Sequence, residues 1–412
     1  MSWTRVITLS FVLPFVACTV PQARAEPGTL VIVGGGLEAD NDAVFSTFLD
    51  ARAPDAPAIA IIPAASGEPS SSADSFRDAL VQHGADAADI TVVRIATQDD
   101  PATTDIDESL WTGNVDDPEE IARIAQAGAI WFTGGDQSRI TALLLRPDGR
   151  DTPMLAAIRA RLRDGAVVGG TSAGAAIMSD PMITQGDTLA ALLPGEVGEP
   201  MQTGRGLGFV EGLLFDQHFG ERARLGRLAA ALVSDGVPHR FGLGVDENTA
   251  LVVKQGSTTG RIIGTGYVTL VDASAVERGG GDRFSASNLN ISLAANGDTI
   301  DLATGSVTPA GFRNETIGNE YFDDPPISGG GMALGATSLA QVVGEALLDN
   351  PAARSVERHS FSGGHGVTYR FTQTDASRGW WGRDGGGTAR YAFEKVRFDI
   401  EPIDVIIRNA GY

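Results

Sequence analysis

The chain has 412 residues, 42% of them hydrophobic, which is enough to build one large or two medium-sized domains with real cores. Its formal net charge of −21 opposes binding to nucleic acid or to an anionic membrane through the overall field, so we expect neither partner. The only cysteine, Cys18, falls in a predicted leader, so the mature chain would have no disulfide, cysteine nucleophile or thiolate metal site.

The first 25 residues have the three parts of a secretory signal peptide. A basic start is followed by an apolar run over residues 6–20 and by an Ala-x-Ala cleavage signal before Glu26. This pattern predicts a secreted or periplasmic protein. The apolar run is too short for a comfortable membrane span, and no other stretch reaches 18 apolar residues. A second interpretation is a lipoprotein acylated at Cys18.

From Gly28 to about Ser274, short β-branched runs alternate with helical stretches, which predicts a largely parallel sheet with helices on both faces. The expected strands cover 29–33, 58–62, 90–95, 129–132, the run starting at 167, and 213–215. The expected helices cover 42–49, 74–82, a segment starting at 116–120, and 221–231.

The composition changes after residue 274 to glycine-rich loops between alternating segments at 283–293, 367–372 and 391–407. This pattern predicts a mainly β extension with one helix near 339–347. The expected organisation is therefore a leader (1–25), an α/β domain (26–274) and a β-rich extension (275–412). Within the extension, the Trp380-Trp381 pair is open to two interpretations, core packing or a surface on which a polymer stacks.

Ser172 stands at the apex of the turn Gly170-Thr171-Ser172-Ala173-Gly174, directly after an apolar strand. A nucleophilic serine in a G-x-S-x-G turn needs nearly side-chain-free neighbours, and the amide after it can face a developing oxyanion. Gly135 also follows a strand at the carboxyl edge of the sheet, where ligands bind in open α/β folds. We therefore expect an oxyanion hole made by the amides of Gly135 and Ala173.

The serine needs a base, and His218 is the best candidate among five histidines. It follows the apolar run 213–215 in the turn Asp216-Gln217-His218-Phe219, so it stands at a strand end. An imidazole there can take the hydroxyl proton and return it to the leaving amine. The triple glycine 34–36 lacks the G-x-G-x-x-G spacing, and it predicts a turn with positive φ rather than a phosphate site.

Four motifs in this order closely resemble those of the cyanophycinases, serine peptidases of the family that also contains the aspartyl dipeptidases. The motifs are the segments 132–137, 170–176, 216–219 with the three arginines that follow it, and 244–250. The resemblance implies a flavodoxin-like, class I glutamine amidotransferase-like sheet. It also implies hydrolysis of cyanophycin, a poly-aspartate chain with arginine on each β-carboxyl, to β-Asp-Arg dipeptides through an acyl-enzyme on Ser172.

By matching motif positions, the resemblance implies Ser172 as the nucleophile and His218 as the base. The residues that it implies for the substrate cleft are Gln137, Asp216, Gln217, Arg222, Arg224 and Arg227. The assignment is chemically reasonable because arginine forks can clamp substrate carboxylates, while acidic groups can bind substrate guanidinium groups.

The third member of the triad departs from the family pattern. The family has a Glu eighteen residues after the serine, and this chain has Ala190 there. A carboxylate is still needed to fix the imidazole tautomer and stabilise the imidazolium. We expect Asp187, whose spacing fits the related aspartyl dipeptidases, with Glu196 and Glu199 as alternatives.

Three other functions stay open: a peptidase of short aspartyl peptides, an esterase of the α/β-hydrolase type, and a catalytically silent polymer-binding homologue. The order Ser, Asp, His suits an esterase, but much of the chain lies beyond His218, whereas such enzymes place the histidine near the C-terminus. We expect no cofactor and no metal, and a homodimer is left open as the oligomeric state.

Overall fold

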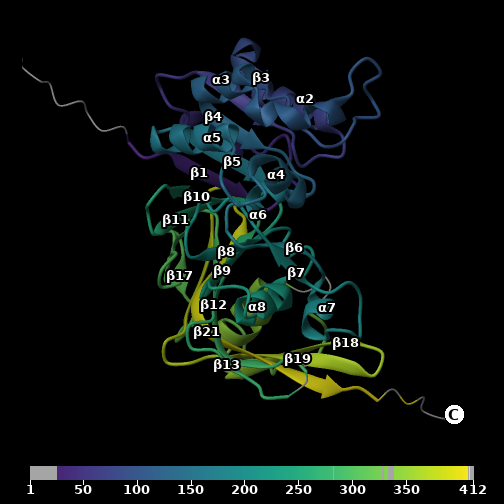
Figure 1. Ribbon diagram of the computed structural model, residues 1–412. Coiled ribbons are helices and arrows are strands. Elements are labelled where there is room, and N and C mark those ends of the chain that lie inside the picture. Colours follow the sequence, from purple (N-terminus) through teal and green to yellow (C-terminus); the bar gives the residue numbers. More distant parts are fainter. Residues whose placement is uncertain (1–25, 282, 327–328, 333–337, 407, 409–412) are drawn as a thin grey trace, which may run out of the picture.

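The computed structural model describes residues 26–281, 283–326, 329–332, 338–406 and 408. The predicted leader, including Cys18, lies outside the described residues. The described chain consists of two large β-sheets, the helices packed on them, and a small sheet of two strands, β6 (Met182–Gln185) and β7 (Gln202–Gly204) (Figure 1). None of the helices in these ranges combines the length and the apolar character that crossing a bilayer would require.

The first sheet has nine strands in the order β16-β15-β11-β10-β1-β5-β4-β2-β3. The five strands from β1 to β3 in that order run parallel, and β10 pairs antiparallel with β1. The bounds are β1 Thr29–Val33, β2 Ala58–Ile62, β3 Ile90–Val92, β4 Ala127–Phe132, β5 Val167–Thr171, β10 Thr249–Lys254, β11 Thr259–Gly264, β15 Thr299–Asp301 and β16 Val307–Thr308. The predicted parallel sheet is confirmed, and its arrangement is consistent with an α/β, flavodoxin-like fold.

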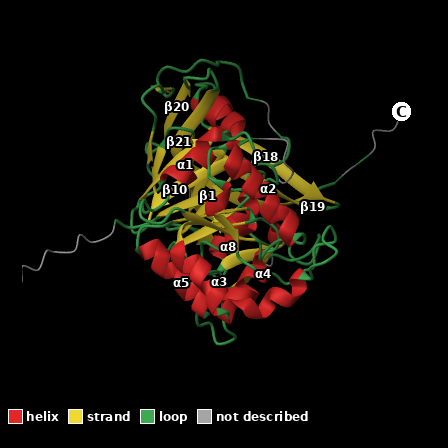
Figure 2. Ribbon diagram, turned by 90° about the horizontal axis from the view of Figure 1, so that it is seen from above, coloured by secondary structure: helices red, strands yellow, loops and turns green. Residues whose placement is uncertain are grey.

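Helices cover both faces of the parallel strands. Side chains alternate along a strand, so Leu30 and Ile32 of β1 face one layer and Val31 and Val33 face the other. The first pair packs with buried residues of α3, α4 and α5, and the second pair with those of α1 and α2. Figure 2 shows the strands between these two groups of helices. The helices are α1 Asp42–Asp50, α2 Pro69–Gln82, α3 Pro118–Gln126, α4 Gln137–Leu144 and α5 Pro153–Arg163.

The second sheet follows the order β17-β20-β21-β14-β12-β9-β8, with β13, β18 and β19 beside this path. β8 and β9 are parallel, and the remaining pairs are antiparallel. The strands are β8 Leu213–Asp216, β9 Phe241–Val245, β12 Tyr267–Asp272, β13 Glu277–Arg278, β14 Ala286–Ala295, β17 Asn314–Glu315, β18 Ser355–Ser362, β19 His365–Thr372, β20 Arg378–Arg383 and β21 Ala389–Asp404. One buried cluster joins this sheet to α7 (Thr188–Leu192), α8 (Leu225–Val233) and the π-helix η3 (Ala340–Leu348).

The boundary expected at residue 274 does not coincide with a boundary between the sheets. β8, β9 and β12 precede it in the chain and share the second sheet with β14 and β21. Conversely, β15 and β16 follow it and extend the first sheet. The β-rich extension is confirmed as a strand-rich region, while its status as a separate domain stays a prediction.

Most predicted elements are present, with shifted ends. The helix expected at 74–82 begins at Pro69, where proline suits the first helical turn. The strand expected at 90–95 ends at Val92, and the helix expected at 221–231 begins only at Leu225. The residues between His218 and α8 form a turn instead, so they are held close to the end of β8.

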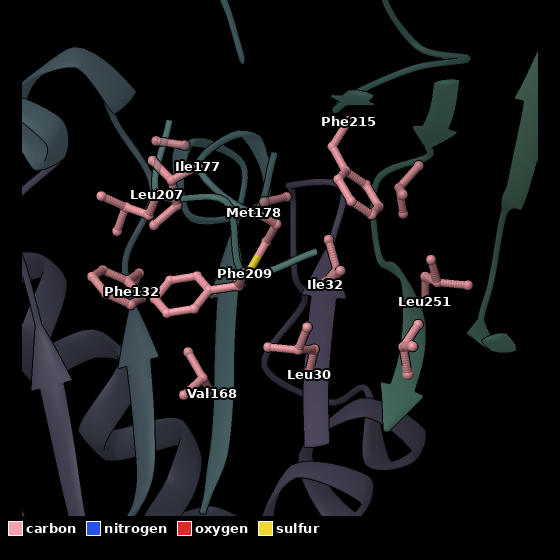
Figure 3. Packing of buried hydrophobic residues seen from close by; sticks show 14 of the residues in the cluster. Leu30, Ile32, Phe132, Val168, Ile177, Met178, Leu207, Phe209, Phe215 and Leu251 are labelled. Carbon is pink, nitrogen blue, oxygen red and sulfur yellow. The ribbon is translucent and has the colours of Figure 1, made fainter. Parts of the chain in front are cut away.

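The core under the serine turn packs apolar side chains from several elements (Figure 3). Phe132, at the end of β4, lies with its ring centroid 6.4 Å from that of Phe209. Ile177 and Met178 follow α6 (Ala173–Ala176) and are fully buried in the same cluster. Burying each such side chain contributes about 1.5–3 kcal/mol, so the turn above rests on a rigid base.

Candidate active site

Ser172 follows β5 directly and has φ 54° and ψ −106°, a conformation that a side chain rarely adopts. Such a backbone costs about 1–3 kcal/mol and persists only where the surroundings enforce it. Here the Ser172 amide donates to the carbonyl of Val33 over 3.0 Å. The turn also packs tightly, since a Cβ at Gly174 would lie 2.7 Å from the Phe132 carbonyl oxygen. Glycine is therefore required at position 174, one of the two outer positions of the turn.

His218 follows β8 and brings its ring to the serine from the second sheet. Its Nε2 lies 2.8 Å from Ser172 Oγ. Its φ is also positive, at 46°, and its amide donates to the carbonyl of Gly34 over 2.6 Å. The pair therefore sits where the carboxyl ends of β5 and β8 meet, at the junction of the two sheets (Figure 1).

The triple glycine after β1 joins the two sheets at this point. Gly35 has φ +126° and Gly36 has φ +49°, so the predicted positive-φ turn is confirmed. A Cβ at Gly35 would lie 2.2 Å from His218 Cε1, and one at Gly36 would lie 2.6 Å from Glu247 Oε2. Glycine is therefore needed for the close approach of the imidazole and its carboxylate as well as for the turn.

Glu247, not Asp187, supplies the carboxylate next to the imidazole. Its Oε1 lies 2.5 Å from His218 Nδ1. The expectation for Asp187 is wrong because its Oδ1 is occupied at the start of α7, where it accepts from the Ala190 amide over 2.8 Å. Neither alternative contacts the ring: Glu196 lies 3.7 Å from His365 Nδ1, and Glu199 is exposed in the same loop.

The sequence did contain a signal for Glu247. It lies in the turn between two apolar strands, β9 and β10, within the segment 244–250 that carries part of the family resemblance. β9 is the parallel neighbour of β8, so the residues after both strands meet at one edge. The spacing of carboxylates after Ser172 does not show that Glu247 lies next to His218, because this contact depends on the pairing of β8 with β9.

The side chain of Asp246 holds the turn that contains Glu247 in place through two hydrogen bonds. Its Oδ1 accepts from the Gly220 amide over 2.8 Å, and its Oδ2 accepts from the Tyr267 amide over 3.0 Å. Burial, together with the negative charge of Glu221, raises the pKa of this carboxyl to about 7. The side chain thus connects the residues after His218 to the strand β12 and limits their movement.

The environment of His218 favours the neutral ring. Burial lowers the pKa of His218, the hydrogen bond that its ring donates to Glu247 opposes this shift, and the charge of Arg222 adds to it. The neutral imidazole, which carries one N–H, is therefore favoured at neutral pH. Its Nδ1 donates to Glu247 while its Nε2 is free to accept the Ser172 proton, as a general base requires.

A cleft of about 590 Å³ opens beside Ser172. The structure brings five of the six predicted substrate residues together in its lining: Gln137, Gln217, Arg222, Arg224 and Arg227. Asp216 is instead buried below the cleft, 2% exposed. It forms ion pairs with two of the cleft arginines, Arg224 and Arg227, and does not itself line the cleft.

The three arginines have different surroundings. Arg227 is buried and pairs with Asp216, with its Nε 3.0 Å from Oδ2. Arg224 lies 3.6 Å from Asp216 Oδ1 and also donates to the Gln217 side chain over 2.7 Å. Burial lowers the pKa of Arg224 to about 10. Arg222 is exposed, and its guanidinium has no hydrogen-bond or ion-pair partner among the described residues.

The side wall of the cleft is fixed by Gln137, whose Nε2 donates to the carbonyls of Ile183 and Thr184 over 2.8 and 3.1 Å. Behind the serine, a Cβ at Gly134 would lie 3.4 Å from Ser172 Cβ, so this glycine pair runs alongside the hydroxyl. Within the described ranges, the amides of Gly135 and Ala173 donate to no protein acceptor. They are available to an incoming oxygen.

The arrangement has the parts that acyl transfer needs: a hydroxyl on a constrained turn, a neutral base beside it, a carboxylate behind the base, and free amides. A polar cleft rich in guanidinium groups leads to it. Across the described residues, no three His, Cys, Asp or Glu side chains are grouped so that they could hold a metal ion.

The model of peptidase family S51 matches residues 30–260 of the chain. This region contains Ser172, His218 and Glu247, and it ends before most strands of the second sheet.

Three curated relatives are cyanophycinases. That of Synechococcus elongatus is 30% identical over 297 residues, which cover 70% of this chain and 84% of the relative. That of Trichormus variabilis is 30% identical over 302 residues, covering 71% and 91%. That of Geminocystis herdmanii is 34% identical over 253 residues, covering 60% and 83%. Among solved structures, a peptidase from an acI-B1 Actinobacterium matches with a TM-score of 0.46 and 18% identity, over 68% of this chain and 98% of that one.

Proposed function

Since this chain belongs to peptidase family S51 and is a serine peptidase, we propose that it hydrolyses cyanophycin to β-Asp-Arg dipeptides with Ser172 as the nucleophile. The observation that carries the proposal is the continuous chain of hydrogen bonds from Ser172 Oγ through the imidazole of His218 to Glu247. In this proposal Glu247 takes the role that the sequence had suggested for Asp187.

The first half of the reaction acylates the serine. Ser172 Oγ attacks the scissile carbonyl carbon while His218 Nε2 takes its proton, and the new positive charge on the ring is stabilised by Glu247. The carbonyl oxygen becomes an oxyanion, which the amides of Gly135 and Ala173 are free to bind. The C–N bond then breaks as His218 returns the proton to the leaving amine, and an ester on Ser172 remains.

The second half reverses these roles with water. His218 takes a proton from a water molecule, the hydroxide formed attacks the ester carbonyl, and the proton returns to Ser172 Oγ as the acid product leaves. His218 Nε2 carries the proton in both halves of the reaction, so no other acid or base from the protein is needed.

The charge of the cleft supports a substrate that carries carboxylates. Arg222 has no protein partner among the described side chains, and its planar fork suits bidentate binding of a carboxylate. Asp136 also lines the cleft and is a candidate partner for a substrate guanidinium. Asp216 contributes by holding Arg227 and Arg224 in place.

The test is to incubate the purified chain with cyanophycin and to measure released β-Asp-Arg by mass spectrometry. Release from the polymer is expected, and Ser172→Ala should reduce it by a factor of at least about 10⁴. Binding of cyanophycin without any release by the intact chain would contradict the proposal and favour a silent binding protein. Faster turnover of isolated aspartyl dipeptides than of the polymer would move the substrate to short peptides.

Export is a separate part of the proposal and depends on residues 1–25. Expressed in a bacterial host, the protein is expected outside the cytoplasm with Glu26 as its first residue, by intact-mass measurement. A mature protein that begins at a lipidated Cys18 would contradict this cleavage site. The homodimer stays a prediction that light scattering on the same sample tests.

A further inference from the structure

A second large cavity lies on the strand-rich half of the molecule and shares no residue with the catalytic cleft. Its volume is about 1040 Å³. We call it the aromatic groove, and its lining residues are Asn314, Glu315, Thr316, Asn319, Tyr321, Phe322, Glu345, Asp349, Trp381, Arg383, Ala389 and Tyr391. Its size is at the upper limit of the range that is usual for ligand-binding pockets.

The register of three strands forms the floor of the groove. Trp381 of β20 lies between Asn314 of β17 and Tyr391 of β21, directly paired with each. Side chains alternate along β20, so Trp380 faces the other way and is buried in the core, only 8% exposed. Of the two rings, Trp380 is therefore a core residue, while Trp381 lines the groove.

Aromatic rings are concentrated at this groove. Three of the ten tryptophan and tyrosine residues of the chain line it, together with Phe322. Tyr321 is 82% exposed and packs edge-on against Phe322, with ring centroids 5.0 Å apart. Exposed aromatic rings do not contribute to folding stability. Several of them around one cavity therefore indicate a surface that binds a ligand.

The charges of the groove indicate a cation. Asp349 is buried, yet both of its carboxylate oxygens accept only from neutral donors: the Tyr321 amide and the Tyr391 hydroxyl, each at 2.8 Å. The carboxylates of Glu315 and Glu345 have no hydrogen-bond or ion-pair partner in the described part of the chain. Three negative charges thus line the cavity without a cationic partner.

Guanidinium is the cation that suits these walls best. It is planar, stacks on aromatic faces and binds carboxylates through two parallel hydrogen bonds, whereas an ammonium is a compact, strongly hydrated point charge. The groove already contains one example, because the guanidinium of Arg383 lies over the Trp381 ring at 5.6 Å from its centroid. This contact shows that the Trp381 face accepts a guanidinium group. Arg383 would therefore compete with a ligand guanidinium for that face.

We propose that the aromatic groove is a second binding site that takes arginine side chains of a polymeric ligand outside the catalytic cleft. That the ligand is the arginine-bearing cyanophycin chain rests on the proposed function, while the preference for guanidinium rests on the groove itself. Bound there, a stretch of polymer would be tethered near the enzyme, which raises the effective concentration of its chain end at Ser172.

The direct test is a titration that does not depend on catalysis. The full-length chain with Ser172→Ala is titrated with octa-arginine and with octa-lysine at physiological salt, and binding is followed by calorimetry. Octa-arginine is expected to bind more tightly than octa-lysine. Trp381→Ala and Tyr321→Ala should each weaken octa-arginine binding about five- to tenfold. Equal affinity for the two peptides would overturn the proposal, because it would leave only attraction to the net negative charge.

Two control variants sharpen this test. Phe361→Ala removes a ring that is 52% exposed but lies outside the groove, so binding should be unchanged. Arg383→Ala should tighten binding, since it removes the internal competitor and frees a face of Trp381. Equal losses in the Trp381 and Phe361 variants would contradict the proposal. Melting curves check that each variant is folded.

A second experiment separates this proposal from the proposed function. With Ser172 intact, Trp381→Ala should lower dipeptide release from insoluble cyanophycin several-fold and leave turnover of a short soluble fragment unchanged. Equal effects on both substrates would contradict a tethering role. If the unmodified chain releases nothing from either substrate, the proposed function fails, while the octa-arginine titration still decides whether the groove binds guanidinium.

Discussion

The catalytic cleft and the aromatic groove differ in how the chain assembles them. In the cleft, each of the two side chains proposed for catalysis lies within two residues of a strand end, so a short segment fixes both its strand and its position: Ser172 directly follows β5, and His218 comes two residues after β8. The groove is assembled by antiparallel pairing of β17, β20 and β21, with Tyr321 and Asp349 added from loops. Local sequence therefore reveals the cleft, whereas the groove becomes visible only when distant segments are paired.

Glu247 shares features of both sites. Like Ser172 it follows a strand, β9, but it contacts His218 only because β9 pairs with β8, which is distant in the sequence. Replacing it with Gln should give the largest effect, a fall in kcat of about 10⁴, since the amide cannot stabilise the imidazolium and favours the wrong tautomer. Asp187→Asn is the matched control. It should leave kcat within about twofold and lower the free energy of unfolding by about 1 kcal/mol or less, through a weaker helix cap. The reverse pattern, in which the Asp187 variant is inactive and the Glu247 variant is active, would restore the sequence-based assignment.

The glycine turn between the sheets gives the next largest effect. In Gly35→Ala the new methyl group would have to occupy space held by the His218 ring, 2.2 Å from Cε1, and the ring must move. A displacement of this size should lower kcat about 10²-fold while binding of substrate changes little. Steady-state kinetics measures both parameters, and Gly84→Ala, at a positive-φ position with open space around it, controls for backbone strain alone. Similar kcat losses in both variants would show that strain, not the ring contact, is responsible.

The cleft arginines should separate into a binding role and a structural role. Arg222→Ala should raise KM at least about tenfold with little change in thermal stability, because it removes one charged hydrogen-bonding group from substrate and none from the fold. Arg227→Ala leaves Asp216 buried and without its closest partner, which should cost about 3–5 kcal/mol of folding free energy. Kinetics and denaturant unfolding of both variants measure the difference. A stable Arg227 variant with only a raised KM would mean that the two arginines act alike.

The pH dependence should show the smallest effect. His218 must be neutral to act as base, so kcat/KM should fall as the pH drops through its pKa. Since burial lowers that pKa, the midpoint should lie below the ordinary value of 6.5. Arg222→Gln removes a positive charge that also lowers it, so the midpoint should move slightly upward. A midpoint that stays fixed in this variant would mean that another group controls the acid limb.

The parallel sheet could be predicted because strand and helix patterns alternate over residues 28–274, and the turns that carry Ser172 and His218 because each lies in one short segment after an apolar strand. The carboxylate beside His218 could not be predicted in this way, because its position depends on β8 and β9 being neighbours, which no local pattern shows. Asp216 was placed in the cleft because a motif position does not show whether a side chain points to substrate or pairs with Arg227 beneath it. The domain boundary expected at residue 274 rests on composition, which does not show that each sheet contains strands from both sides of that residue, and the domain division stays a prediction.

The most direct test of the central claim is to treat the protein with a fluorophosphonate, which forms a stable adduct with an activated serine, and to map the adduct by peptide mass spectrometry. We expect one adduct on Ser172, loss of β-Asp-Arg release in proportion to labelling, and at least about 10²-fold slower labelling in both His218→Ala and Glu247→Gln. An adduct on a different serine, or full hydrolysis by protein labelled completely at Ser172, would contradict it.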